Sequence, residues 1–268
     1  MKIFILFTCM LFCACQKFDK RNDELVPLCL YASNETSRGI PNSDSPMKIG
    51  LFVCEENTEK PYGGNTEYMG VKATLKNGTW QTDIPLYVGD APATIYAYCP
   101  DTLDISNPRE MPVNSRTMDL LYGKCTGINN QNPEAILSMQ HLFARLKLRM
   151  YYLGFDEGYR VATFVAIGNV NQAKSFSTSG SLNIYSGTLT STPNINAKSF
   201  LPAGDTYTLP DVPTAEEYME MLVIPTKFGE NEMKITVRLK SPATKSFILN
   251  AGGWLPGTTN RYTLMIRP

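Results

Sequence analysis

Alternation of apolar and polar side chains, with a period of two residues, is the feature that most constrains how this chain can fold. Residues 233–240 show it most clearly, because every second side chain is apolar and the charged side chains all fall between them. Residues 145–150 and 262–266 repeat the pattern. This period is typical of antiparallel β-strands that turn one face to a core and the other to water.

Short apolar runs separated by Pro and Gly predict further strands, over residues 48–54, 93–99, 159–168, 182–185, 218–224 and 245–250. The dipeptide Asn77-Gly78 lies between two strand-like runs, and both residues tolerate the positive φ angles of a two-residue hairpin turn. Helical periodicity is nearly absent. The sequence therefore predicts an all-β fold built from β-sandwiches.

The length of 268 residues is large for one sandwich and comfortable for two. Residues 126–133 are rich in Asn and Gly and lack an apolar rhythm, so they could join two cores without contributing to either. We therefore expect a junction near residue 134, with an N-terminal β-sandwich domain over residues 39–134 and a C-terminal one over residues 135–268.

The first 15 residues have the basic start and short apolar run of a secretory signal, too short to span a bilayer. The run ends in Phe12-Cys13-Ala14-Cys15, which resembles a bacterial lipobox with Phe12 at a position where Leu is usual. The resemblance makes Cys15 the predicted site of lipidation and anchors the protein in the outer membrane. An ordinary cleaved signal is the alternative.

Four cysteines are scattered through the rest of the chain: Cys29, Cys54, Cys99 and Cys125. None has metal-site spacing, and with a single histidine a zinc cluster is not expected. Export permits disulfides, and Cys54 with Cys99 is the first pairing to consider, although sequence does not fix connectivity. Buried free thiols are the simpler alternative.

Little in the sequence points to catalysis. His141 is the only imidazole available for a catalytic triad, and a single histidine at the start of a strand is more often structural. A glycosidase carboxylate pair stays an open alternative, because only separation in space would identify it. Basic and acidic residues both number 25, which does not suggest a nucleic-acid partner. We expect no enzymatic activity, no metal and no cofactor.

Two tryptophans, Trp80 and Trp254, are candidates for a platform on which a sugar ligand could stack. Aromatic rings in strand proteins more often fill the core. Their burial decides between the two interpretations.

Several motifs occur in order along the chain: the lipobox ending at Cys15, Ala97-Tyr98-Cys99-Pro100, Asp119-Leu120-Leu121-Tyr122-Gly123, His141-Leu142-Phe143-Ala144-Arg145-Leu146, and Trp254-Leu255-Pro256-Gly257 leading into Tyr262-Thr263-Leu264. Together they resemble the fimbrillin family of the Bacteroidales, the type V pilins and their relatives. Cys99 and Asp101 depart from the aromatic residues usual in that family. The resemblance implies two transthyretin-like β-sandwich domains in tandem, and assembly into a fimbrium by strand exchange.

In type V pilins a trypsin-like protease cuts a loop that follows the first strand. Residues 23–33 supply a candidate first strand here, with one apolar side formed by Val26, Leu28, Leu30 and Ala32. By this resemblance Arg38 is the predicted cleavage residue, Gly39 the new N-terminus, and residues 16–38 a propeptide. Pro27 suits only an edge position, because it lacks an N–H. An uncut Arg38 in a surface loop is the alternative.

Removal of that strand would expose a hydrophobic groove and unpaired backbone groups, which favour capture of a strand from another pilin subunit. The sequence stops at Arg267-Pro268, directly after its last predicted strand, so the expected subunit accepts a strand and donates none. The sequence thus predicts a tip or accessory subunit that adheres to a host or bacterial surface ligand. Two alternatives are an uncleaved anchor subunit and a monomeric glycan-binding surface lipoprotein.

Overall fold

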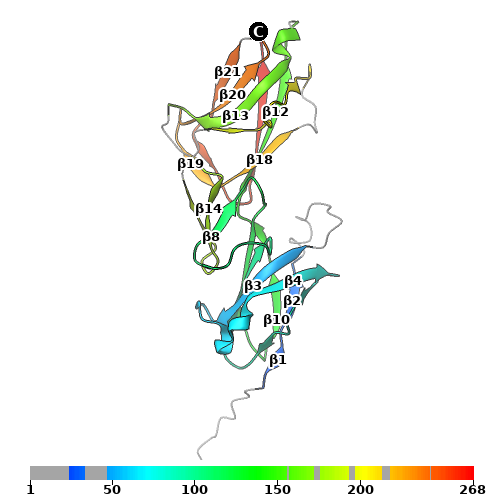
Figure 1. The fold of residues 1–268 in the computed structure, drawn as a ribbon, viewed down its shortest axis with the longest axis vertical. Helices are drawn as coiled ribbons and strands as arrows, with labels where there is room; N and C mark the ends of the chain where they lie inside the picture. The colour runs from blue at the N-terminus through cyan, green and yellow to red at the C-terminus, as the bar shows by residue number, and fades with distance from the viewer. Residues whose placement is uncertain are drawn as a thin grey trace, which may run out of the picture.

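The computed structural model describes residues 24–33, 47–155, 157–171, 176–192, 197–212, 218–241 and 243–268. Within these ranges every regular element is a strand, apart from three single 3-10 turns: η1 (Tyr62–Gly64), η2 (Thr66–Tyr68) and η3 (Glu157–Tyr159). The molecule is elongated, with two β-rich halves stacked along its long axis (Figure 1). The all-β prediction is confirmed.

The first half is organised by one eight-stranded sheet with the order β10-β2-β5-β4-β3-β7-β9-β11. Its strands are β2 (Cys29–Ala32), β3 (Lys48–Glu55), β4 (Met69–Lys76), β5 (Thr79–Thr82), β7 (Ala93–Cys99), β9 (Leu121–Ile128), β10 (Glu134–Leu137) and β11 (Gln140–His141). The two end strands, β10 and β11, follow each other in the chain, and β10 also lies next to β9. The sheet therefore curls into a nearly closed ring, in which β2 fills the place between β10 and β5.

The predicted hairpin forms the turn between β4 and β5. Asn77 and Gly78 have φ angles of 50° and 80°, as a two-residue turn of this type requires. The apolar faces of the ring enclose the first core, which includes Leu51, Ile95 and Trp80.

The second half contains two sheets, with the orders β18-β12-β23 and β16-β13-β20-β21. Their strands are β12 (Ala144–Tyr152), β13 (Val161–Asn169), β16 (Ala197–Ser199), β18 (Met219–Val223), β20 (Met233–Leu239), β21 (Thr244–Ile248) and β23 (Thr259–Ile266), and β17 (Tyr207–Thr208) also pairs with β13. Alternate residues of β12 and β20 are buried in the second core, as their sequence pattern predicts. A short pair of strands, β19 (Thr226–Phe228) and β22 (Gly252–Trp254), packs the rings of Phe228 and Trp254 against each other at 5.0 Å.

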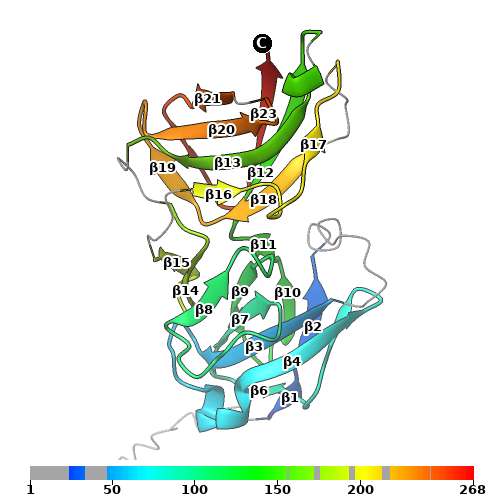
Figure 2. The same ribbon diagram turned by 45° about the horizontal axis from the view of Figure 1, so that its top comes forward.

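A hairpin from the second half reaches back to the first. Its strands, β14 (Ser179–Asn183) and β15 (Thr188–Ser191), form a small sheet with β8 (Met111–Asn114), which lies between the halves (Figures 1 and 2). The contact buries a third apolar cluster, which includes Phe52 of the first sheet and Leu182 of the hairpin. The rings of Tyr96 and Tyr185 also meet there, edge to face, at 5.5 Å.

The stretch at residues 126–133, which the sequence suggested as a linker, is a turn inside the first sheet. It contains the end of β9 and leads into β10, which pairs with β2. The boundary expected at residue 134 thus falls where β10 begins, and the chain crosses to the second half between β11 and β12, at Leu142 and Phe143. A polar, Gly-containing turn and a linker have the same composition, which is why the sequence pattern did not separate them.

The suggested Cys54–Cys99 disulfide is wrong. Cys54 lies opposite Thr94 in the β3–β7 ladder, whereas Cys99 is at the far end of β7. At about 3.3 Å per residue along a strand, their Cα atoms are much farther apart than the roughly 7 Å that a disulfide allows. All four cysteines in the described ranges are free thiols. Burial raises the pKa of both Cys54 and Cys99 to about 12, which keeps them protonated and unreactive.

Candidate functional site

The amino-terminal segment takes part in the first core. Leu30 is buried there, and Val26, Leu28 and Ala32 pack against the same cluster from partly buried positions. Pro27 and Cys29, which alternate with them, face solvent. The expected one-sided apolar pattern of the first strand is therefore present in the structure.

The segment is divided at Leu28 into two short strands with different partners. Its first part, β1 (Val26–Pro27), pairs only with β6 (Tyr87–Val88) among the described strands, so Pro27 occupies the kind of single-sided position that its missing N–H requires. Its second part, β2, has neighbours on both sides. The expected edge position thus applies to β1 and is wrong for β2.

We call the place of β2 between β10 and β5 the strand slot. On one side β2 runs parallel to β10 over four residue pairs, from Cys29↔Glu134 to Ala32↔Leu137. On the other side it meets β5 at a single antiparallel pair, Tyr31↔Thr79. Backbone N–H groups of the segment donate to carbonyls on both sides of the slot, including Cys29 N to Pro133 O at 2.9 Å and Ala32 N to Gly78 O at 3.0 Å.

Neither tryptophan forms a ligand platform. Trp80 is 3% exposed in the first core, and Trp254 is 1% exposed in the second. The Trp254 indole N–H donates to the Tyr262 hydroxyl at 2.9 Å, and its ring packs on Phe176 and Phe228. Both rings fill cores, so the platform interpretation is corrected and the basis for a sugar site at these residues is lost.

Three predicted site residues lie outside the described residues. Cys15, the lipidation candidate, precedes the first described range. Arg38 and Gly39, the candidate cleavage residues, fall between β2 and β3.

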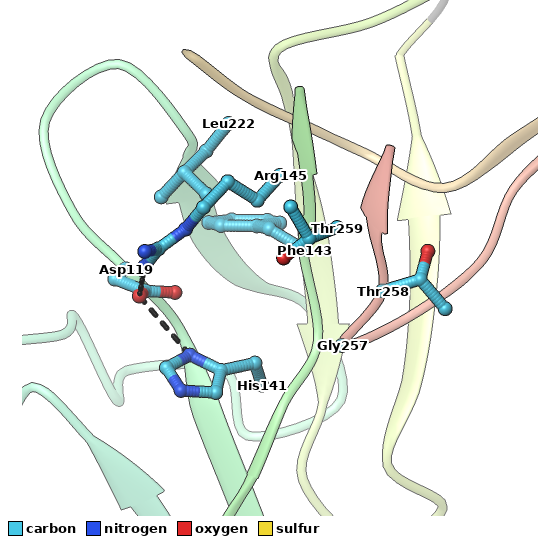
Figure 3. Close-up of a pocket in the computed structure, with 8 residues that line it drawn as sticks. All are labelled: Asp119, His141, Phe143, Arg145, Leu222, Gly257, Thr258 and Thr259. Atoms are coloured by element: carbon cyan, nitrogen blue, oxygen red, sulfur yellow. Dashed lines mark ion pairs between the residues drawn. The ribbon is translucent and has the colours of Figure 1, made fainter. Parts of the chain in front are cut away.

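A polar cluster connects the two halves where the chain crosses between them. Asp119 Oδ2 lies 3.0 Å from Nδ1 of His141 and 3.5 Å from Nη2 of Arg145 (Figure 3). Asp119 precedes β9, His141 belongs to β11, and Arg145 belongs to β12, so this carboxylate joins the first sheet to the second half. His141 is held by Asp119 and does not face a serine or cysteine nucleophile in the pocket around it, which fits the expected structural role.

A pocket of about 290 Å³ opens beside this cluster, lined by Asp119, His141, Arg145 and the backbone turn at Gly257–Thr259. It adjoins a larger groove of about 510 Å³, and the two share Asp119, Arg145 and Leu222. We call the two together the junction groove. The polar side chains of the larger part are Ser115, Arg116, Asp119, Arg145, Lys198, Ser199 and Glu220.

Lys198 is an unusual member of the groove. It is only 9% exposed, and its ammonium donates to the carbonyl oxygen of Leu222 at 3.0 Å. Burial, together with the charge of Arg116, lowers the pKa of Lys198 to about 8. Sequence reasoning did not single out Lys198 or Arg116, because nothing in their local pattern signals that β16 turns a lysine inward.

The described residues contain no group of three or more His, Cys, Asp or Glu side chains placed to hold a metal ion. In the same ranges, no helix has the length and apolar character needed to cross a membrane.

A comparison with protein-family models matched residues 41–268 to the fimbrillin-like family. The chain belongs to the fimbrillin-like family. This family comprises fimbrial and adhesion proteins of the cell surface and not enzymes, so the sequence resemblance and the expected lack of enzymatic activity are confirmed. No protein with a curated description matches the sequence.

Solved structures share the fold of this fimbrillin-like chain at low sequence identity. A candidate cell adhesion protein from Bacteroides uniformis has a TM-score of 0.62 and 17% identity, covering 91% of this chain and 93% of that one. A candidate cell adhesion protein from Bacteroides ovatus has a TM-score of 0.60 and 16% identity, with coverages of 90% and 92%. A fimbrial protein from Bacteroides vulgatus has a TM-score of 0.54 and 12% identity, with coverages of 90% and 95%. At these identities the likeness supports the fold.

Proposed function

We propose that this protein is a subunit of a fimbrium and that it joins a neighbouring pilin subunit by strand exchange. In this scheme a trypsin-like protease cuts between Arg38 and Gly39, the segment that contains β1 and β2 leaves, and a strand of the neighbour enters the strand slot. One observation carries the proposal: β2 closes the first sheet through only five residue pairs, while its apolar side completes the core.

The position of the family match agrees with this scheme. The match begins at residue 41, after β2 and just beyond the proposed cut, so the amino-terminal segment lies outside the matched region. Loss of β2 would leave an apolar cleft lined by β10 and β5, and a vacant row of backbone donors and acceptors. Such a gap has a strong tendency to bind an extended segment from another chain.

We propose that the chain forms two transthyretin-like β-sandwich domains in tandem, after a signal peptide at residues 1–15 and a propeptide at residues 16–38. The separate first and second cores support this division. The pairing of β10 and β11 with strands of the first sheet favours a boundary at Leu142–Phe143, in place of residue 134. The hairpin β14–β15 is then an extension of the second domain that docks on the first.

We also propose delivery to the outer membrane as a lipoprotein acylated at Cys15, followed by a tip or accessory position in the fimbrium. The accessory position is supported by β23, which pairs with β12 over eight residues and buries Leu264 and Ile266 in its own core. A strand held in this way is not free to be donated to a neighbour. Formation of long homopolymers by the processed protein alone would contradict this position.

Mass spectrometry of the protein taken from the cell surface tests the processing step. A mature N-terminus at Gly39 is expected in wild-type cells, and Arg38→Ala should retain the propeptide and stay out of the fimbriae. Arg21→Ala, a matched change within the propeptide, should be processed normally. A wild-type protein that starts at an acylated Cys15 and is nevertheless incorporated into fimbriae would refute cleavage after Arg38.

A further inference from the structure

The junction groove contains cations that its own acidic groups do not neutralise. Its two carboxylates are already engaged: Asp119 with His141 and Arg145, and Glu220 with Arg145 and Lys147. Among the described residues, neither Lys198 nor Arg116 has a carboxylate partner. The groove lining therefore contains three cationic side chains, Arg116, Arg145 and Lys198, against two carboxylates. The two cations without an ion pair are near enough for the charge of Arg116 to act on Lys198.

Of these two cations, Lys198 is the buried one and so loses more of its hydration. Its ammonium has three N–H donors, yet the acceptor that it reaches, Leu222 O, also accepts a hydrogen bond of 2.8 Å from the Ser115 hydroxyl. Burying an ammonium without an opposite charge is unfavourable in free energy, because burial removes hydration that a single carbonyl does not replace. The lowered pKa of Lys198 has the same cause. An anion bound here would supply what the ammonium lacks.

The smaller part of the groove contains a hydrogen-bond acceptor, the carboxylate of Asp119. Asp119 Oδ1 is buried and has no hydrogen-bond partner among the described residues, while Oδ2 receives both His141 and Arg145. In Figure 3 this carboxylate lies between the imidazole and the guanidinium. Oδ1 has less than 1 Å² of exposed surface, but the Asp119 side chain as a whole is 26% exposed and lines both parts of the groove. Its carboxylate is thus an acceptor for a hydroxyl group, and one ligand that carries both an anionic group and hydroxyls would match both parts of the groove.

We propose that the junction groove binds an acidic sugar, with the anionic group of the sugar between Lys198 and Arg116 and a ring hydroxyl directed to Asp119. The size of the larger part, about 510 Å³, falls in the range of small-ligand sites and has room for a monosaccharide. The proposal rests on the proposed adhesive function for its biological meaning, since it names a ligand class for that function. The site itself is complete in a single chain and does not involve the strand slot.

Titration of the uncleaved full chain with sugars by calorimetry at pH 7 tests the proposal. The probes are glucuronate, galacturonate and N-acetylneuraminate, with glucose and galactose as neutral counterparts. At least one acidic sugar should bind with a Kd on the order of 1 mM or tighter, and roughly tenfold more tightly than its neutral counterpart. A lack of binding by every acidic sugar overturns the proposal.

Two variants assign the binding to the groove. Lys198→Met removes the buried charge and keeps the length of the side chain, and Arg116→Gln changes an exposed residue that should not affect folding. Each should weaken acidic-sugar binding roughly tenfold, while Lys76→Met, at an exposed position at the end of β4, should not. Unchanged binding by both groove variants overturns the site.

Two further probes separate the sugar from other anions. Sodium sulfate should bind more weakly than the acidic sugar, because it makes no contact with Asp119. A short poly-aspartate peptide should also bind more weakly. Equal or tighter binding of either overturns the sugar assignment. None of these measurements depends on processing at Arg38, so failure here is distinguishable from failure of strand exchange.

Discussion

Each of the two cores is completed by a strand that lies parallel to its neighbour, and the two strands differ in how many residues pair with the rest of the sheet. In the first half, β2 lies parallel to β10 over four residue pairs and adds one pair with β5. In the second half, β23 lies parallel to β12 over eight residue pairs without interruption. The amino-terminal strand is also split at Leu28, whereas β23 is continuous.

The side chains of a closing strand can therefore be deeply buried while few backbone hydrogen bonds hold the strand in the sheet. Leu30 is as deeply buried as most core residues, yet few backbone pairs hold the strand that carries it. Since each ladder hydrogen bond adds roughly 0.5–1.5 kcal/mol of net stability, a strand with fewer pairs can leave more readily than one with eight. The strand exchange proposed above therefore involves the closing strand with fewer backbone pairs.

The largest expected effect is in the second core. Trp254→Ala removes a ring that packs on Phe176 and Phe228, and should lower the free energy of unfolding by about 3–5 kcal/mol in urea denaturation. Tyr262→Phe, which deletes only the hydrogen bond to the indole, should cost about 1 kcal/mol. A smaller loss for the tryptophan change than for the tyrosine change would show that this core is not closely packed.

A matched pair of truncations tests the comparison directly. Leu30→Ala and Leu264→Ala each remove a buried leucine from a closing strand, and each should cost about 2–5 kcal/mol. Only Leu30→Ala should speed incorporation of a fluorescent peptide with the sequence of residues 24–33, because only that change weakens the strand in the slot. Equal acceleration by both changes would remove the distinction between the two closures.

The contact between the halves can be weakened at the turn of the β14–β15 hairpin. Gly187 has a φ of +69°, and a Cβ there would lie 2.5 Å from the Tyr122 ring of the first sheet. Gly187→Ala should therefore destabilise the protein by about 1–3 kcal/mol, from backbone strain and from the clash. Gly204→Ala is the control, because it has a φ of +90° with open space around it and carries the strain alone. Thermal unfolding of both variants measures the clash as their difference.

A pH dependence of stability is the last expected effect. The pKa of Lys198 is about 8 in the folded protein, against an ordinary value of 10.5, so the unfolded chain binds more protons between these values. Stability from this group therefore rises with pH across that window. Lys198→Met should be more stable than wild type below pH 8, and its advantage should shrink as the pH rises toward 10.5. Urea denaturation at several pH values checks this, and a constant difference would contradict the burial of a charged lysine.

Local patterns predicted the strands well and their partners poorly. Strand β7 occupies the predicted residues 93–99, and the alternation in β12 and β20 correctly identified the buried side of each. Alternation is a property of neighbouring residues, so it is visible in the sequence. Which strand lies opposite is decided by contacts far apart in the chain, and this is why the docking of β14 on β8 and the separation of Cys54 from Cys99 were missed.

The candidate sites divide in the same way. The apolar side of the amino-terminal strand is a local pattern, and its packing into the first core was anticipated. The junction groove brings together Arg116 from the turn after β8, Lys198 from β16 and Glu220 from β18, so no spacing in the sequence indicates it. Burial of Trp80 and Trp254 also depends on packing, which composition alone does not reveal.

The docking of β14 on β8 has a mechanical consequence. A tensile load that enters at the first sheet can pass to the second half through the peptide link at Leu142–Phe143 and also through the β8–β14 ladder. Two separated attachments resist bending of one half relative to the other, whereas a single covalent link would let the halves rotate freely about it. The apolar cluster around Phe52 and Leu182 braces the same joint, so the molecule should behave as a stiff rod under shear flow.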